Sequence, residues 1–324
     1  MANTRQLVKL SELQCHLNSP KKQGTMMPGC AGRYLIGQLA GAAVLAATYA
    51  NIATAQDAPF ASYDAQSAQI LNDAHDLDIG PDGRLYVADK LNGRVAILDP
   101  DSLELVGAFG DGSLPHVRDV SFGPDGLAYV AVTGTSSVEV YRITGNTAEK
   151  VRSLTGLPRV EGALAHSNGR IYAMASGVGQ LLMLDQEGAI RATMPNLYGG
   201  HDVAEAPDGT IWVGTTRGAL VHLDPDLRLL NVLDAAKFGF LGPRYLDFDE
   251  LGRMVVADQD AHRFLLIDPS GPDGGSFLGV LGTGHPGMEN GQFDDPEGIA
   301  ILGNTYYLSD SDNGRIVRYR VVMN

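Results

Sequence analysis

Cysteine is nearly absent from the 324-residue sequence, and its two copies, Cys15 and Cys30, both fall within the first 56 residues. The rest of the chain therefore has no disulfide, no thiolate nucleophile and no cysteine-ligated metal. Several enzyme signatures are missing too: Gly-x-Ser-x-Gly, a phosphate-binding loop, His-Glu-x-x-His and a dinucleotide-binding fingerprint. Their absence removes several common classes of hydrolase, nucleotidase and dehydrogenase.

Basic residues are scarce as well, with 24 Lys and Arg against 38 Asp and Glu. Five of the basic residues and one acidic residue lie in the first 56 positions. The remainder thus carries 19 basic against 37 acidic side chains, a formal charge of −18. So acidic a surface argues against nucleic acid or an anionic membrane as a partner and favours cation binding.

The first 56 residues differ in character from the rest of the chain. Scattered basic residues precede an Ala- and Leu-rich run over about 34–55, which ends in Ala53-Thr54-Ala55-Gln56. A basic start, an apolar centre and a small-residue exit are typical of a secretory signal. The alternative is an uncleaved anchor, because the run is nearly long enough to span a bilayer. We predict a signal peptide at 1–56 and an exported mature domain at 57–324, periplasmic or extracellular, with no membrane contact after cleavage.

Helical periodicity is almost absent after residue 75, and a repeat of about 40 residues takes its place. Each unit has an apolar inner run, a Gly-containing turn and a β-rich pair of strands. The turn glycines are Gly83, Gly126, Gly169, Gly209, Gly252 and, after a longer insertion, Gly303. Six such units predict an all-β, six-bladed β-propeller of four-stranded blades, whose closed ring leaves no open sheet edge.

The sixth unit stops after its third strand, at the end of the sequence. Residues 65–71, AQSAQIL, are the only spare strand-like segment. We predict that they supply the missing strand, so that an N-terminal strand closes the ring. Trp212, the only tryptophan, is predicted to pack between blades. His166 and His222, which fall on a turn and an outer strand, are predicted to lie at the surface.

The last unit, residues 282–319, carries the clearest motif, with a Gly-rich loop ending in GQF, a Pro-x-Gly, an aromatic strand and Asp-x-x-Asn-Gly-Arg-Ile. This unit resembles an NHL repeat, and the resemblance extends over about residues 60–324, most strongly in the first, fifth and sixth units. It implies a propeller fold. It does not imply one function, because propellers of this kind include lyases, lactonases and binding modules.

Inner strands line the channel of a propeller, and the residues entering them form its mouth. Alignment of the six inner runs places one ionisable residue of each unit at this entry: His75, Arg118, Glu161, His201, Arg244 and Glu297. The next positions are Asp76, Asp119, Gly162, Asp202, Tyr245 and Gly298. One interpretation is a solvated, self-neutralising ring; the other is a functional site, since convergent ionisable groups in a concavity are typical of one.

Two histidines with nearby carboxylates form a nitrogen and oxygen set suited to a divalent cation, with Zn and Ca as the main candidates. We predict the metal ligands His75, His201, Glu297, Asp76 and Asp202. The predicted catalytic residues are Arg118, Arg244, Glu161 and Tyr245. The arginines would hold an anionic group of the ligand, and a glutamate would transfer a proton.

Two families resemble parts of this ring. Peptidyl-hydroxyglycine amidating lyases hold zinc with channel histidines at this position, which His75 and His201 match in part. The pair His201-Asp202 also resembles that family's His-Asp, whose Asp helps to hold calcium. Gluconolactonase-type propellers hold a divalent cation with a Glu-Gly pair among their ligands, which Glu161-Gly162 and Glu297-Gly298 resemble.

These observations favour an exported propeller enzyme that uses a channel-bound divalent cation for lyase or hydrolase chemistry. Its ligand would be a small anionic molecule or a peptide at the channel mouth. The alternative is a non-catalytic NHL module that presents the same face to a protein or glycan partner.

Overall fold

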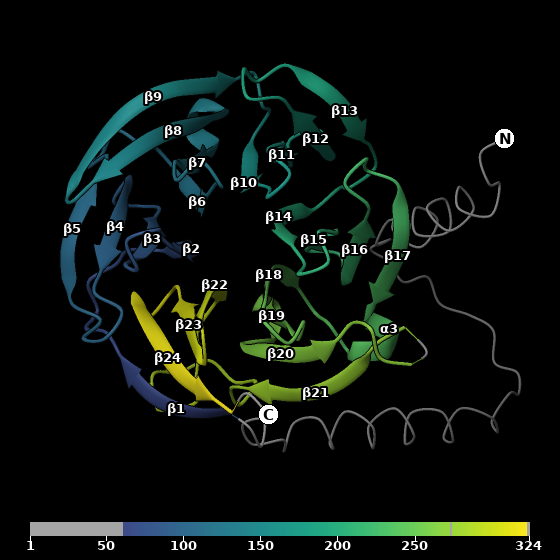
Figure 1. The fold of residues 1–324 in the computed structure, drawn as a ribbon. Helices are drawn as coiled ribbons and strands as arrows, with labels where there is room; N and C mark the ends of the chain where they lie inside the picture. Colours follow the sequence, from purple (N-terminus) through teal and green to yellow (C-terminus); the bar gives the residue numbers. More distant parts are fainter. Residues whose placement is uncertain (1–60, 273, 323–324) are drawn as a thin grey trace, which may run out of the picture. The chain divides into compact units, whose positions relative to one another are not determined.

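The computed structural model describes residues 61–272 and 274–322, which form six four-stranded antiparallel sheets arranged in a ring (Figure 1). The predicted all-β, six-bladed propeller is confirmed. The predicted signal peptide, residues 1–56, lies outside the described residues. Within the described ranges, no helix has the length and apolarity needed to cross a membrane.

The blades follow one another along the chain, each running from an inner strand at the channel to an outer strand at the rim. Blade 1 contains β2 (Ala74–Ile79), β3 (Leu85–Asp89), β4 (Arg94–Leu98) and β5 (Leu105–Phe109). Blade 2 contains β6 (Val117–Phe122), β7 (Ala128–Val132), β8 (Ser137–Thr144) and β9 (Thr147–Thr155), with the 3-10 turn η1 (Thr133–Thr135). Blade 3 contains β10 (Val160–Ala165), β11 (Ile171–Ala175), β12 (Gln180–Leu184) and β13 (Ile190–Met194).

The second half of the ring repeats this order. Blade 4 contains β14 (Gly200–Glu205), β15 (Ile211–Thr215), β16 (Ala219–Leu223) and β17 (Leu229–Asp234), followed by the short helix α3 (Ala235–Phe238). Blade 5 contains β18 (Pro243–Phe248), β19 (Met254–Asp258), β20 (Arg263–Asp268) and β21 (Ser276–Leu281), with the 3-10 turn η2 (Gln259–Ala261). Blade 6 contains β22 (Pro296–Leu302), β23 (Thr305–Asp310), β24 (Arg315–Val321) and β1 (Ala61–Gln66).

The ring is closed by β1, which pairs antiparallel with β24, Ala61 opposite Val321. Closure by an N-terminal strand is confirmed, but its predicted position at residues 65–71 is wrong, because the strand ends at Gln66. The buried or half-buried face of β1 consists of small and aromatic residues at 61, 63 and 65. Leu71, by contrast, has turned away from the strand and packs in the core between blades 6 and 1.

The hydrophobic core is divided among the junctions between blades. The second strand of every blade is buried at every position, because it packs between two neighbouring sheets. Five apolar clusters each combine side chains of two adjacent blades. Trp212 belongs to the cluster between blades 4 and 5, as predicted. His166, predicted at the surface, is instead buried, where its Nε2 lies 3.1 Å from the carbonyl oxygen of Gly209 in the next blade.

A buried Asp–Arg pair fixes the loop that enters the blade in blades 1, 5 and 6. In blade 6, Nε of Arg315 donates to Oδ2 of Asp310 at 2.6 Å, and Oδ1 of Asp310 accepts from the backbone N–H of Asp294. The equivalent pairs are Asp89 with Arg94 and Asp258 with Arg263. These are the three units in which the sequence motif is clearest, so the motif has a structural explanation.

We expect Arg315→Met to lower the free energy of unfolding by about 3–5 kcal/mol, because it leaves the buried Asp310 carboxylate without its cation. Arg315 is buried and also donates to Gln66 of the closing strand. Urea unfolding followed by circular dichroism measures the loss. The control is Arg228→Met, which removes an exposed pair with Asp224 and should cost less than about 1 kcal/mol. Equal losses in the two variants would contradict the assignment.

Candidate functional site at the channel entry

Every inner strand contains a β-bulge, and every bulge falls at the entry residue. In blade 2, Val117 pairs with Val132 and Asp119 with Ala131, so Arg118 is an extra residue in the ladder. The other register shifts lie between Ala74 and Leu77, Val160 and Gly162, Gly200 and Val203, Pro243 and Tyr245, and Pro296 and Ile299. A bulge interrupts the regular alternation of a strand and re-aims its side chain. This explains how two consecutive residues of one strand both contribute to the channel.

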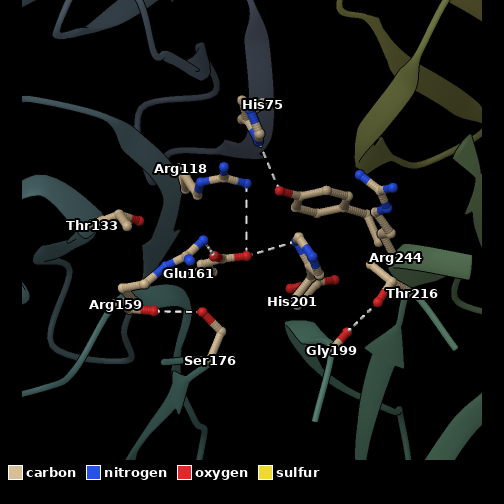
Figure 2. A network of polar contacts seen from close by, with 12 residues as sticks. His75, Arg118, Thr133, Arg159, Glu161, Ser176, Gly199, His201, Thr216 and Arg244 are labelled. Atoms are coloured by element: carbon tan, nitrogen blue, oxygen red, sulfur yellow. Dashed lines mark hydrogen bonds and ion pairs between the residues drawn. The ribbon is translucent and has the colours of Figure 1, made fainter. Parts of the chain in front are cut away.

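Glu161 is the centre of one group of contacts (Figure 2). Its Oε2 lies 2.8 Å from Nδ1 of His201 and 3.6 Å from Nη1 of Arg118, and its Oε1 accepts from Arg159 at 3.1 Å. Burial alone would raise the pKa of Glu161, but the adjacent His201 and Arg118 outweigh it and hold that pKa at about 2. Glu161 is therefore ionised at neutral pH.

His75 is the centre of a second group. Its Nε2 lies 3.1 Å from Oδ1 of Asp73, while its Nδ1 lies 2.8 Å from the Tyr245 hydroxyl and close to Oε2 of Glu297. Burial opposes the charged imidazolium, yet the carboxylates of Glu297 and Asp73 together raise the pKa of His75 above its usual value. The imidazole thus sits between two carboxylates and one phenol.

Tyr245 packs against both histidines. Its ring centroid lies 6.1 Å from that of His75 and 6.2 Å from that of His201. Burial, reinforced by the charge of Glu297, raises the pKa of its phenol well above 10, so the hydroxyl keeps its proton.

The remaining two entry residues point to different partners. Nη2 of Arg244 pairs with Oδ1 of Asp260 at 3.1 Å. Glu297 is buried and accepts from Nε2 of Gln259 at 2.5 Å. The two arginines of the entry ring therefore differ in their partners. Arg118 lies beside Glu161, whereas Arg244 pairs with an aspartate of its own blade.

A second layer of carboxylates lies along the channel from the entry. Asp76, Asp119 and Asp202 come together there, within 4.8 Å of one another by one oxygen each. With Asp78 and Asp247 they line a cavity of about 170 Å³. Burial, and then the charge of the neighbouring aspartates, raises the pKa of Asp76 and Asp119 well above the usual range. Burial likewise raises the pKa of Asp202 to about 7.

These aspartates also have a structural role, because they link inner strands that share no ladder. Asp119 accepts from the backbone N–H of Ala163 in blade 3, and Asp202 accepts from that of Leu246 in blade 5 at 3.0 Å. Close packing between neighbouring inner strands likewise explains the glycines of the two Glu-Gly pairs. A Cβ on Gly162 would lie 2.6 Å from the carbonyl oxygen of His201, and one on Gly298 would lie 2.5 Å from Cα of Asp76.

The predicted metal ligands fall into two sets among the described residues. His75 and Glu297 group with Asp73, and Asp76 and Asp202 group with Asp119, while His201 belongs to neither set. Asp73 and Asp119 were not among the predicted ligands. Asp119 was visible in the sequence, one position after an entry residue, whereas Asp73 precedes the strand and reaches His75 through a left-handed backbone conformation, which no sequence pattern indicated.

Several polar atoms around the entry remain without an aligned hydrogen bond in the described part of the chain. They include Nε2 of His75, Oε2 of Glu161 and Oε2 of Glu297, all on side chains that are at most 3% exposed. Their close N···O approaches lack hydrogen-bond geometry. Each of these atoms nevertheless lies within ion-pair distance of a side chain of opposite character, so the groups satisfy one another by proximity and not by aligned hydrogen bonds.

The fold and this ring define a six-bladed β-propeller with an ionisable channel mouth. Residues 60–233 match the family model described as a domain of unknown function, DUF5074, and the chain belongs to that family. No curated protein matches the sequence.

Solved structures of similar fold include several enzymes. A virginiamycin B lyase from Staphylococcus aureus is 11% identical, with a TM-score of 0.56 over 81% of this chain and 100% of its own. A PQQ-bound aldose sugar dehydrogenase from Streptomyces coelicolor is 14% identical, with a TM-score of 0.57 over 81% and 98%. A protein of unknown function from Bacteroides thetaiotaomicron is 13% identical, with a TM-score of 0.64 over 83% and 74%. Because these identities are so low, the likeness shows a shared fold and nothing more.

The two carboxylates beside His75 predict an unusual titration. We expect His75 to lose its proton above pH 6.5 in a histidine NMR titration, and Asp73→Asn to lower that pKa. Because the folded state then binds the proton more tightly than the unfolded chain, the stabilisation is complete below about pH 6.5 and is lost as the pH rises through the native pKa. His222 is an internal control, since burial lowers its pKa and Asp73 should not affect it. A His75 pKa that is unchanged in Asp73→Asn would contradict the assignment.

Proposed function

We propose that the channel entry is the active site of a lyase or hydrolase that acts on a small anionic substrate with the help of a bound divalent cation. The observation that carries this proposal is the convergence of buried ionisable groups at the entry, where His75 contacts Glu297 and Tyr245 and Glu161 contacts His201. Ionisable groups with shifted pKa values that converge in a concave site are characteristic of catalytic sites.

His201 is the proposed general base. Glu161, 2.8 Å from its Nδ1, has a pKa of about 2 and is therefore a poor proton acceptor itself. Its role is to orient the imidazole and to stabilise the imidazolium that forms when the other ring nitrogen, Nε2, takes a proton from the substrate or from water. The glutamate thus acts through the histidine.

Tyr245 is the proposed general acid. Its hydroxyl is protonated and lies 2.8 Å from Nδ1 of His75, and the phenol is close enough to Arg118 to raise the pKa of that guanidinium. When the phenol gives its proton to the leaving group, protonated His75 replaces it, and the fixed charge of Arg118 stabilises the oxyanion in between. Arg118 and Arg244 also provide planar donors that can bind a carboxylate or phosphate of the substrate.

Two sets of side chains fit a divalent cation, each by its donor chemistry. Asp76, Asp119 and Asp202 offer only carboxylate oxygens, which suit Ca²⁺. Asp73, His75 and Glu297 offer one nitrogen and two oxygens, which suit Zn²⁺, but there the ion would replace the contacts that His75 makes now. A cation at either set would polarise a substrate oxygen or acidify bound water. We favour the aspartate set, since its carboxylates have no cationic partner in the lining of their cavity.

Further support comes from charge and from fold. The acidic mature chain suits an exported protein with a cationic cofactor and no nucleic-acid partner. Several of the proteins of similar fold are lyases, and one is a sugar dehydrogenase, which is consistent with catalysis on this scaffold. The substrate would be a small molecule or a peptide end that enters the channel mouth.

A non-catalytic module is the second candidate, and an apolar rim favours it. The loops on the entry side of the ring expose large apolar side chains, each at least 40% exposed: Leu91, Val178, Tyr198, Leu241 and Met288. Such side chains could contact a protein partner across the mouth. The two candidates differ in whether the polar centre or the apolar rim is essential.

For the catalytic proposal, the test is a screen of the purified protein against lactones and hydroxyglycine-extended peptides. With a substrate in hand, His201→Gln and Tyr245→Phe should each lower kcat by about 10²–10⁴-fold, the usual contribution of general acid–base catalysis. Leu91→Ser is the matched control and should leave kcat unchanged. A normal kcat in both channel variants, with loss of a protein partner in Leu91→Ser, would favour the binding module.

For the cation, metal per chain is measured by mass spectrometry after exchange into metal-free buffer with added Ca²⁺ or Zn²⁺. We expect one ion per chain in the wild type and none in Asp119→Asn with Asp202→Asn, while circular dichroism remains β-rich. His75→Ala with His201→Ala should retain the ion if it occupies the aspartate set and lose it if it occupies the histidine set. Equal occupancy in all variants would exclude both sets.

A further inference from the structure

A second cavity, of about 230 Å³, lies between blades 4 and 5. It opens at the turns that follow the inner strands, which is the opposite end of the blades from the channel entry. Its main lining residues are Asp208, Thr210, Trp212, His222, Phe248 and Pro269. Nothing in the proposed chemistry of the channel uses this cavity.

The same place is filled by an arginine at other junctions. Between blades 1 and 2, Arg84 lies over the Tyr86 ring, 5.7 Å from its centroid, and reaches Asn146 of blade 2. Between blades 2 and 3, Arg152 lies 5.8 Å from the centroid of Tyr129 and donates to Gln186 at 2.6 Å. In both cases a guanidinium covers an aromatic ring of the second strand and bonds to the next blade.

At three further junctions an arginine also bonds to the next blade. Arg170 donates to the carbonyl oxygen of Pro225 in blade 4 at 2.8 Å, and Arg318 donates to that of Pro100 in blade 1 at 2.7 Å. Between blades 5 and 6, Arg253 lies 3.4 Å from the carbonyl oxygen of Val322. The acceptors Pro100 and Pro225 belong to the Asp-Pro turns that close the third strand of their blades.

The junction between blades 4 and 5 has the corresponding Asp-Pro turn but no arginine in the described lining of its cavity. Thr210 follows its turn glycine, where blades 1 and 3 have Arg84 and Arg170. Pro269 is the counterpart of Pro100 and Pro225, and it lines the cavity. Among the described residues that form the lining, none is a lysine or an arginine.

We propose that this inter-blade cavity binds a guanidinium group supplied by a ligand, in the position that an arginine of the chain occupies at the other junctions. Asp208 gives the charge complement, Pro269 gives the turn that accepts guanidinium donors elsewhere in the ring, and the stacked Trp212 and His222 give the aromatic wall.

The electrostatics of the cavity fit a cation. Asp208 is exposed at the edge of the cavity. Its Oδ1 accepts from the backbone N–H and the hydroxyl of Thr210, and its Oδ2 has no hydrogen bond within the described part of the chain, so it is accessible to a ligand. Burial would raise the pKa of Asp208, but the Thr210 hydrogen bonds lower it, so the carboxylate is charged. Burial lowers the pKa of His222, which is therefore neutral at pH 7 and does not repel the ligand.

Trp212 makes the proposal directly measurable, because it is the only tryptophan of the chain and its ring stacks on His222 at 4.1 Å. We would titrate the full protein with N-acetyl-arginine amide and follow Trp212 fluorescence. We expect a saturable change, and at least a tenfold weaker response to the neutral isostere N-acetyl-citrulline amide. Ethylguanidinium and a Gly-Gly-Arg-Gly-Gly peptide then identify the source of the guanidinium. Tighter binding of ethylguanidinium indicates a free small molecule, and tighter binding of the peptide indicates an arginine of a partner protein.

Two variants and one control complete the test. Asp208→Asn should weaken binding of the arginine probe about tenfold and leave binding of the citrulline probe unchanged. Asp125→Asn, at the equivalent turn of blade 2, should leave the binding of both probes unchanged. Thr210→Arg should fill the cavity from within, abolish the response and raise Tm. The proposal is overturned if arginine and citrulline probes act alike, if no probe gives saturation, or if Asp208→Asn binds as the wild type does.

Discussion

Six inner strands converge on one axis, and this crowding constrains almost every residue around the channel. Neighbouring inner strands belong to separate sheets, so no backbone ladder links them. Side chains and close backbone contacts link them instead. Asp119 and Asp202 each accept a backbone N–H of the following blade, and Gly162 and Gly298 lie too close to the next strand to carry a Cβ. Residues whose types and positions in the sequence suggest metal ligands thus also hold neighbouring blades together.

This double role concentrates negative charge in a place where water is limited. An aspartate that bridges two blades must lie inside the ring, and several such aspartates raise one another's pKa in addition to the effect of burial. The carboxylates can then hold protons or share a cation. The positive groups of the ring are at the entry, where His75 and Arg118 lie. The entry therefore mixes cations with carboxylates, whereas the charged residues lining the cavity behind it are all acidic.

The sequence predicted the ring because each blade repeats a pattern with a clear physical meaning, an apolar run, a turn glycine and two β-rich strands. It also predicted the six entry residues, since one alignment of the inner runs fixes them together. The pairing of these residues could not be predicted. The β-bulges that re-aim the side chains leave no signal in the residue pattern, and Asp73 reaches His75 from outside the repeat. The closing strand lies about four residues earlier than predicted, because Ala61, Tyr63 and Ala65, and not the apolar Ile70 and Leu71, form its inward face.

The order His-Arg-Glu occurs twice around the entry, yet the two halves of the ring are not equivalent. After its arginine, blade 5 has Tyr245 where blade 2 has Asp119, so one half places a neutral phenol at the entry and the other places a carboxylate in the channel. The two histidines also differ in their partners. His75 bonds the phenol and lies between Asp73 and Glu297, which favours the protonated form, whereas His201 faces Glu161 alone among the entry carboxylates. A symmetric ring would give both imidazoles the same surroundings, whereas here each imidazole has its own set of polar neighbours, and this asymmetry is what the proposed division of roles between His201, Tyr245 and His75 rests on.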